Sequence, residues 1–405
     1  MIKERIFLKL NDDDLERHFG IPKSQSKKNN YLLRLIKCLY GLRQSSREWY
    51  QLLRKLLMEC GCIPIAKDDC LYVKRTGGAW VIILVHVDDM SVFFNGKGKV
   101  LRDSIYNHLI KKIEVRNQGL LRYYLKMNIE YDSLNGIMKI SQPYHEILFQ
   151  ERFCMSEWKE RDTPLPVSGK YVLAPGDYEN QTPEEKFAAE QFPIREFIGN
   201  VIWPLQTHPT LAFLCSYLGS HVNKPTYKLW MNCKWAGGFA VKHCFGNGLV
   251  YRRPKDFGKF DIGFMGFSDS SWADCLFTRR SSGGYLVFFF GMLVSWSSGK
   301  TKSALQSTSV GEAEMWFAYL LAKELVYLMD MALELDIFPK HLFEAAWQCV
   351  DSKSTIEGLR LIGVTARNKH WDIRIFYTRA LNNEVKRIRF LWVDTTKQHA
   401  DIMTK

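Results

Sequence analysis

The sequence predicts a multidomain protein of the α/β (α+β) class. The chain has 405 residues, which is enough for two or three domains. From about Asp261 onward, strand patterns at 263–269, 282–290 and 292–297 precede a long helix pattern. Nearer the N-terminus, two apolar runs within residues 80–94 flank an Asp-Asp pair, as expected for a β-hairpin. Strands and helices alternating in this way are typical of layered mixed domains.

The composition supports folded cores and a polyanionic partner. Hydrophobic residues make up 46% of the chain and aromatic residues 14%, which argues against disorder. The 56 Lys and Arg residues exceed the 43 Asp and Glu residues, so the net charge of +13 suits nucleic acid. The ten scattered cysteines include no Cys-x-x-Cys, and we interpret them as reduced thiols. The N-terminus lacks a signal peptide and no apolar run could span a bilayer. We therefore expect an intracellular protein, cytoplasmic or nuclear or both, without membrane attachment.

Helix and strand patterns can be followed along the first half of the chain. Residues 32–59 are mostly helical in pattern, with an early break at Gly41. Strand patterns follow at 70–74 and around Asp88, then a basic amphipathic helix at 99–112. Two further strands are predicted at 123–129 and 137–141.

The second half begins with a change of composition. Residues 161–192 are rich in proline and in acidic and polar residues, which predicts a linker. Helical patterns follow at 197–222 and 227–241. After the three strands near Asp261, we expect a helix at 311–335, a strand at 346–350, more helix, and a strand at 387–393.

Two adjacent carboxylates, Asp88 and Asp89, lie at the predicted hairpin turn. Neighbouring acids repel, so burying either one without a partner is costly. A divalent cation at the turn would account for the pair, because Mg²⁺ prefers hard oxygen ligands. A solvated hairpin turn is the alternative, since Asp is common in turns.

A second set of acids lies in the last part of the chain. Asp269 and Asp351 each end a predicted strand, Glu314 lies in the first turn of the long helix, and Asp401 opens the C-terminal segment. Acids at strand ends point out of the edge where α/β domains place ligands. Four converging carboxylates would balance two divalent cations, the arrangement used for in-line phosphodiester displacement. Each acid alone could be a solvated cap or turn residue, and Glu314 could simply favour a helix N-terminus.

Seven motifs occur in order along the chain: Cys38-Leu-Tyr-Gly-Leu-Arg-Gln-Ser-Ser-Arg-Glu-Trp-Tyr50, Val85-His-Val-Asp-Asp89, Ser268-Asp-Ser-Ser-Trp-Ala-Asp274, Arg279-Arg-Ser-Ser-Gly-Gly-Tyr285, Trp296-Ser-Ser-Gly-Lys300, Lys369-His-Trp-Asp-Ile-Arg374 and Ala400-Asp-Ile-Met-Thr-Lys405. Together they resemble copia-type retrotransposon polyproteins (Pol) over nearly the whole chain. Several of the motifs are long and share no composition bias.

The resemblance implies a domain order and two activities. It implies a partial reverse transcriptase, with right-hand palm and thumb, at 1–160, and the linker at 161–192. A helical connection segment at 193–258 and a ribonuclease H-like mixed α/β domain at 259–405 follow. The implied activities are RNA-directed DNA synthesis and cleavage of RNA in RNA–DNA hybrids. The implied cofactor is Mg²⁺ or Mn²⁺, and the implied partners are RNA, DNA or their hybrid and other retroelement proteins.

The resemblance also implies roles for individual acids. It assigns Asp88 and Asp89 to the polymerase palm as metal ligands. It assigns Asp269, Glu314, Asp351 and Asp401 to the nuclease as catalytic metal ligands. Glu312 is the alternative to Glu314, because the spacing to the preceding Ser307-Thr308 pair is enlarged here. Met315-Trp-Phe-Ala after Glu314 favours Glu314.

Departures from the family pattern predict a loss of synthesis. The family has a further palm Asp upstream of Val-Asp-Asp, and Met1 corresponds to the segment after that strand. Asp12, Asp13 and Asp14 follow the apolar run 6–10; we interpret them as an exposed turn or helix start, with a substitute metal role as the alternative. We therefore expect an N-terminally truncated, synthesis-defective fragment whose nuclease survives; an in-frame strand encoded upstream of Met1 would change that expectation. The rival hypothesis is a catalytically dead nucleic-acid-binding relic or host-adopted protein.

Further departures from the family pattern occur along the chain, and two series of basic residues suggest a nucleic-acid-binding surface. His86 replaces an aromatic residue, Leu125-Lys126 replaces Leu-Gly, and Thr207-His-Pro-Thr210 replaces Thr-Arg-Pro-Asp. Basic residues suited to nucleic-acid binding recur in two series: Lys97, Lys99, Arg102, Lys111, Lys112 and Arg116, then Lys224, Lys228, Lys234 and Lys242. We predict that Trp230 and Trp235, within the second series, belong to the core. His399, near Asp401, is predicted to be a surface loop residue, with a role in leaving-group protonation or product release as the alternative.

Overall fold

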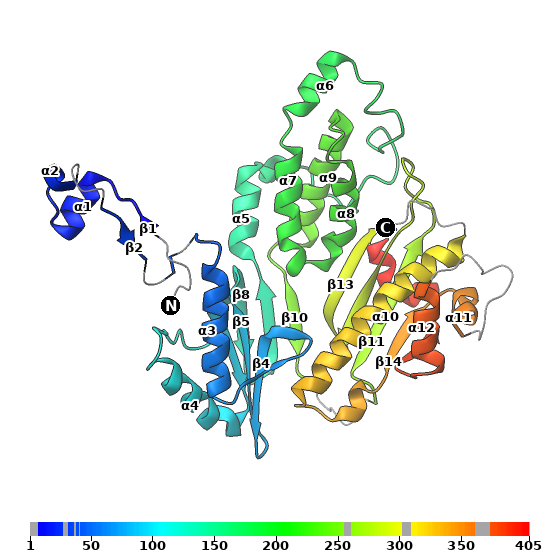
Figure 1. Cartoon of the computed structure of the whole chain (residues 1–405). Helices are drawn as coiled ribbons and strands as arrows, with labels where there is room; N and C mark the ends of the chain where they lie inside the picture. Colours follow the sequence, from blue (N-terminus) through cyan, green and yellow to red (C-terminus); the bar gives the residue numbers. More distant parts are fainter. Residues whose placement is uncertain are drawn as a thin grey trace. The chain divides into compact units, whose positions relative to one another are not determined.

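The computed structural model describes residues 7–26, 31–35, 38–39, 41–254, 261–301, 309–360 and 373–404. Some positions used in the sequence analysis lie outside these residues: Ile6, the Ser307-Thr308 pair and most of the Lys369–Arg374 motif. The chain divides into two compact units, Met1–Asn117 and Gln118–Lys405. Figure 1 shows the course of the chain through each of them. None of the described helices is both long enough and apolar enough to cross a membrane. The domain boundaries at 160, 192 and 258 stay predictions.

The first unit is built on an antiparallel sheet of order β3-β4-β5-β6. Its strands are β3 (Ile63–Ile65), β4 (Asp68–Thr76), β5 (Ala79–His86) and β6 (Asp89–Phe94). A separate two-stranded sheet joins β1 (Phe7–Leu8) to β2 (Leu33–Arg34). The helices are α1 (Asp12–Phe19), α2 (Lys23–Ser26), α3 (Ser45–Glu59) and α4 (Lys99–Leu109).

The core of this unit lies between its sheet and the helices α3 and α4. Val81, Ile83 and Val85 alternate along β5 and pack in one cluster with Leu57 of α3 and Ile105 of α4. The predicted helix over 32–59 is correct from Ser45 onward and wrong at residues 33–34, which pair as a strand. Gly41, with a φ of 91°, takes a left-handed conformation that cannot continue a helix.

The second unit begins with an antiparallel sheet of order β10-β9-β8-β7. Its strands are β7 (Tyr123–Tyr124), β8 (Met127–Asp132), β9 (Ile137–Ser141) and β10 (Leu249–Arg252). Between β9 and β10 the chain forms α5 (Pro143–Arg152), α6 (Pro183–Glu190), α7 (Ile194–Ile202), α8 (Ala212–His221) and α9 (Tyr227–His243). The single helix expected over 197–222 is two helices, since 3₁₀ turns at Trp203–Gln206 and Pro209–Leu211 interrupt it. Pro204 and Pro209 cannot donate helical hydrogen bonds, which explains the break.

The helices of this region share a core rich in aromatic side chains. Phe149, Phe197 and Trp230 pack together, and Phe149 and Phe197 are almost fully buried. Residues 161–192, which have the composition of a linker, contain α6 and the buried Leu173, which belongs to the same core. The proline-rich segment is therefore anchored on the helices by apolar contact.

The last part of the chain forms a mixed five-stranded sheet of order β13-β12-β11-β14-β15. Its strands are β11 (Phe264–Ser271), β12 (Ser282–Phe289), β13 (Met292–Lys300), β14 (Ala346–Val350) and β15 (Ile388–Trp392). The helices are α10 (Val310–Leu335), α11 (Lys353–Arg360) and α12 (Ile373–Asn383), and short 3₁₀ turns include Lys340–Phe343, Thr395–Lys397 and His399–Met403. The strands β11, β12 and β13 are antiparallel, whereas β11, β14 and β15 are parallel. This confirms the predicted mixed α/β arrangement of the last part of the chain.

Both faces of this sheet are covered. Val287 packs in the core beneath α10, which crosses one face of the sheet (Figure 1), while its neighbour Leu286 packs with Ala212 of α8 on the other. A Cβ atom at Gly283 would lie 2.4 Å from the Phe317 ring of α10. The missing side chain thus lets α10 approach the sheet closely, and its first turns come to lie beside the end of β11.

Candidate metal centre

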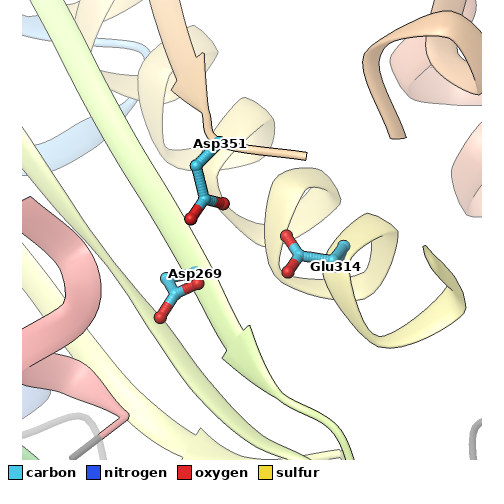
Figure 2. A group of neighbouring side chains, drawn as sticks. All are labelled: Asp269, Glu314 and Asp351. Carbon is cyan, nitrogen blue, oxygen red and sulfur yellow. The ribbon is translucent and has the colours of Figure 1, made fainter. Parts of the chain in front are cut away.

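Three carboxylates gather where β11, α10 and β14 meet. Asp269 lies on β11, Glu314 in the N-terminal part of α10, and Asp351 directly after β14. One oxygen from each lies within 4.8 Å of the others. Figure 2 shows the three side chains reaching this spot from two strands and a helix. Among the residues that the structure describes, these three acids form the one cluster of Asp, Glu, His or Cys side chains close enough together to hold a metal ion.

Local structure explains why these acids meet. Phe267 and Cys349 are partners in the parallel pairing of β11 with β14, and Asp269 and Asp351 each follow by two residues. The two acids therefore reach the same edge of the sheet at the same level. Ser309 caps α10 by accepting a hydrogen bond from the backbone N–H of Glu312 at 3.3 Å. Glu314 falls on the buried face that the helix turns toward the sheet.

Burial and mutual repulsion make this site electrostatically costly. Asp269 is 7% exposed and Glu314 is 6% exposed. Burial, with a further contribution from the charges of Asp351 and Asp401, raises the pKa of Asp269 to about 6. Burial, followed by the charges of Asp269 and Asp351, raises the pKa of Glu314 to about 9. Buried acids in this state gain from a cation, and an all-oxygen donor set fits Mg²⁺ or Mn²⁺.

The fourth predicted acid, Asp401, lies at the edge of this group. It is half-buried in the 3₁₀ turn His399–Met403, and its charge contributes to the raised pKa of Asp269. It is not one of the three acids within 4.8 Å. The buried Thr404 donates a hydrogen bond from Oγ1 to Oδ2 of Asp269 at 3.0 Å. Sequence reasoning missed Thr404, because a contact across 135 positions leaves no local signal.

Glu314 and Glu312 differ in their position relative to the three-acid group. Glu314 is buried and belongs to the three-acid group, whereas Glu312 lies outside the group and is only half-buried. The geometry therefore favours Glu314, and its role as the metal ligand of this helix stays a prediction.

Asp88 and Asp89 lie at the predicted hairpin, far less enclosed than the acids above. Val87 and Asp88 form the turn, and His86 pairs with Asp89 across it. Both acids and His86 are exposed. Trp49 Nε1 donates a hydrogen bond to the Val87 carbonyl at 2.6 Å, so the turn is tied to α3. The hairpin prediction is confirmed, and the metal-ligand role of the two acids stays a prediction.

The acids near the N-terminus begin a helix. Asp12, Asp13 and Asp14 form the first turn of α1, where the Asn11 side chain accepts a hydrogen bond from the backbone N–H of Asp14 at 2.7 Å. Asp13 also forms an ion pair with Lys23. Acids are favoured at a helix N-terminus, and the prediction of a helix start is confirmed.

The second basic series is largely engaged within the fold. Lys224, Lys228 and Lys242 each form an ion pair at 2.6 Å, with Glu179, Asp177 and Asp162 respectively. Trp230 is buried in the helical core, as predicted. Trp235 donates from Nε1 to the Thr163 carbonyl at 2.9 Å. This series therefore serves internal packing first, and phosphates would have to compete for its charges.

His399 lies on the surface, as predicted. It is exposed in the 3₁₀ turn that carries Asp401, and its ring packs edge-on against Phe267 at a centroid distance of 4.7 Å.

Comparison with known proteins gives the family context. Residues 18–166 match the family described as "Reverse transcriptase (RNA-dependent DNA polymerase)". The chain is 28% identical over 380 residues to the retrovirus-related Pol polyprotein from transposon TNT 1-94 of Nicotiana tabacum. It is 26% identical over 381 residues to the Pol polyprotein from transposon RE2 of Arabidopsis thaliana. Each alignment covers 93% of this chain but only 27% and 24% of the respective relative. The chain thus spans about a quarter of the length of these relatives.

A solved structure aligns with part of the chain. It is the N-terminal RNase H domain of rv2228c from Mycobacterium tuberculosis, fused to maltose binding protein. The alignment has 16% identity and a TM-score of 0.25, and it covers 35% of this chain and 91% of that one. The fold assignment here rests instead on the strand order and directions described above. The chain is therefore similar to retrotransposon Pol polyproteins over 93% of its length, and its residues 18–166 match a reverse transcriptase family.

Proposed function

We propose that this chain cleaves the RNA strand of RNA–DNA hybrids at the site formed by Asp269, Glu314 and Asp351, with Mg²⁺ or Mn²⁺ as cofactor. The observation that carries the proposal is the convergence of these three acids from β11, α10 and β14. The relationship to Pol polyproteins supports the choice of substrate, since hybrids arise when DNA is copied from RNA.

Each residue of the site has a separate role in this proposal. Asp269, Glu314 and Asp351 would hold the metal, and Asp401 would add a fourth carboxylate at the edge. A bound divalent cation supplies a nucleophilic water and neutralises charge at the phosphate. Thr404 would orient Asp269 through its hydrogen bond to Oδ2. Asp351 is half-buried, so it is more accessible to solvent than Asp269 and Glu314.

The nuclease is better supported than DNA synthesis. In the part of the chain that the structure describes, no third acid joins Asp88 and Asp89 in a metal-binding group. The proposal therefore keeps RNA-directed DNA polymerase as the ancestral activity and hybrid cleavage as the one to test first.

The test uses the full chain with an RNA–DNA hybrid labelled on its RNA strand. We expect RNA fragments with Mg²⁺ or Mn²⁺ and none after chelation. Asp351→Asn should reduce cleavage to the level of the chelated sample, because it removes one charge from the metal ligands. Glu314→Gln should do the same.

Glu312→Gln is the matched control, because it makes the same change on the same helix outside the group. It should cleave like the unmodified chain. Cleavage that survives Asp351→Asn would sink the proposal. Binding of the hybrid without cleavage under any metal condition would also overturn it and support the non-catalytic nucleic-acid binder instead.

A further inference from the structure

We propose that Trp392 and Lys353 form a subsite beside Asp351 that contacts a strand of the nucleic acid. The inference rests on the proposed nuclease function and names the surface that would position its substrate. Nothing in the motifs of the sequence singles out either residue.

The sheet brings Trp392 to the same end of the parallel strands as the candidate metal ligands. Val350 and Trp392 are partners in the parallel pairing of β14 with β15, and each is the last residue of its strand. Asp351 is the residue after Val350, so it lies beside Trp392. Trp392 Nε1 donates a hydrogen bond to the main-chain carbonyl of Asp351 at 2.9 Å. The indole is therefore held next to a candidate metal ligand without using that ligand's carboxylate.

Lys353 completes the pair. It is the first residue of α11, two positions after Asp351, and its Nζ lies 4.7 Å from the centroid of the Trp392 ring. A cation over an indole face is a favourable contact. However, a lysine in the first turn of a helix opposes the helix dipole, so helix stability does not explain its place.

The pair is open to solvent. Trp392 is 43% exposed and Lys353 is exposed, although an indole gains from burial. A second indole, Trp272, is 46% exposed just beyond the end of β11, on the other side of β14 in the strand order. Two exposed tryptophans thus lie at the ends of the strands that flank β14, one as the last residue of β15 and one directly after β11.

Nucleic acid is the partner whose chemistry fits this surface. An exposed indole offers a face on which a base or sugar can pack, and the adjacent ammonium can pair with a phosphate. Lys397 adds a further exposed positive charge nearby along the chain, while Asp394 is occupied in capping Thr396. An acidic peptide would find the cation but would leave the indole faces unused.

The test measures binding apart from cleavage. The probe is a fluorescent hybrid of DNA with 2′-O-methyl RNA, which lacks the 2′-hydroxyl and resists cleavage. Fluorescence anisotropy should show that Trp392→Ala weakens binding about tenfold or more, as for loss of one stacked base. Trp392→Phe should keep most of the affinity, because it keeps an aromatic face. Lys353→Gln should weaken binding and reduce the slope of log affinity against log salt by about one.

Arg389 provides a matched control. Its guanidinium carbon lies 5.9 Å from the centroid of the Trp347 ring on the same two strands. Both residues lie three positions before the ends of their strands. Arg389→Gln removes the same charge as Lys353→Gln and should leave affinity near that of the unmodified chain. The Mn²⁺-induced rise in melting temperature should persist in Trp392→Ala, which would show that the metal site and the fold are intact.

The outcomes separate this inference from the proposed function. Binding that is lost in Trp392→Ala, in a chain that never cleaves hybrids, would support the subsite and overturn the nuclease. Cleavage by the unmodified chain together with unchanged binding by Trp392→Ala and Lys353→Gln would overturn the subsite alone. Failure of the unmodified chain to bind the hybrid would overturn both.

Discussion

Glu314 combines deep burial with two acidic neighbours. Its pKa of about 9 is raised first by burial and then by Asp269 and Asp351. An unfolded glutamate ionises near pH 4.5, so between that pH and about 9 the folded state binds more protons than the unfolded state. Stability of the cation-free protein should therefore fall as pH rises through this window.

Glu314→Gln should remove the part of this dependence that comes from Glu314, and the smaller part from Asp269 should remain. Without divalent cations, at about pH 8, the variant should be more stable than the unmodified chain, by something on the order of a few kcal/mol. At about pH 4 the contribution from ionisation should vanish, because Glu314 is protonated in both states. Urea denaturation in EDTA at the two pH values measures the difference. A variant that is less stable at pH 8 would contradict the expectation, and Glu312→Gln serves as the control.

Val87 adopts a backbone conformation that suits it poorly. Its φ is 56°, in the left-handed region, where a β-branched residue is strained by about 1–2 kcal/mol. It occupies the first position of the two-residue turn between β5 and β6, where asparagine is preferred. The side chain is 58% exposed, so little packing offsets the strain.

Val87→Asn should stabilise the first unit by about 1 kcal/mol. The Trp49 hydrogen bond uses the Val87 carbonyl and survives the change. Chemical denaturation measures the gain. Val100→Asn, at another exposed valine but within helix α4, should bring no gain. Equal stability of Val87→Asn and the unmodified chain would show that the turn relieves its strain in another way.

A buried hydrogen-bonded network joins separate elements of the second unit. Glu146 of α5 accepts from the backbone N–H of Gly246 at 2.7 Å, and its other oxygen lies 2.8 Å from Nε2 of His208. The Glu146 and His208 side chains are only 3% and 4% exposed. His208 stands where the related motif has arginine. The network thus ties α5 to the turn before α8 and to the loop before β10.

Removing one partner of this network should be costly. Glu146→Ala should lower the unfolding free energy by about 3–5 kcal/mol, because it leaves buried polar groups without partners. Replacing both Glu146 and His208 with leucine should cost less than the sum of the single changes. A double-mutant cycle in urea measures this coupling. The exposed Arg152–Glu196 pair is the control, and Glu196→Ala should change the unfolding free energy far less than Glu146→Ala does. Additive effects at Glu146 and His208 would rule out the coupling.

At the scale of the whole molecule, the two acidic sites should respond differently to cations. The three-acid group of the second unit is buried and closely spaced, whereas Asp88 and Asp89 in the first unit are exposed. A cation that binds only the folded protein at one hundred times its Kd stabilises it by about 2.7 kcal/mol.

Mn²⁺ should therefore raise the melting temperature through the second unit. Calorimetry with and without Mn²⁺ should show the shift in the unmodified chain and in an Asp88→Asn, Asp89→Asn variant. The shift should be absent in Asp351→Asn, which loses one ligand charge. If the shift were lost in the Asp88 and Asp89 variant instead, the stabilising cation would bind in the first unit, and the expectation would be wrong.

Features with a local cause are readable along the chain. The strands around Asp269 and the helix predicted at 311–335 match β11 and α10 (Val310–Leu335) closely, since their apolar residues repeat with the period of one element. The single helix predicted at 197–222 missed the break at Pro204 and Pro209. The helical pattern at 32–59 likewise missed the pairing of residues 33–34 with β1, which depends on a partner strand distant in the sequence. Trp230 illustrates the same rule, because its apolar neighbours already indicated a core residue.

The acids at the strand ends, the mixed α/β class and the family relationship all follow from residue order, because periodicity and motifs are local properties. Which acids meet was decided only when β11 paired with β14 and the close approach at Gly283 brought Glu314 beside them. The bonds from Thr404 to Asp269 and from Trp392 to Asp351 span 135 and 41 positions. Such contacts depend on strand register and packing, which no short stretch of sequence specifies.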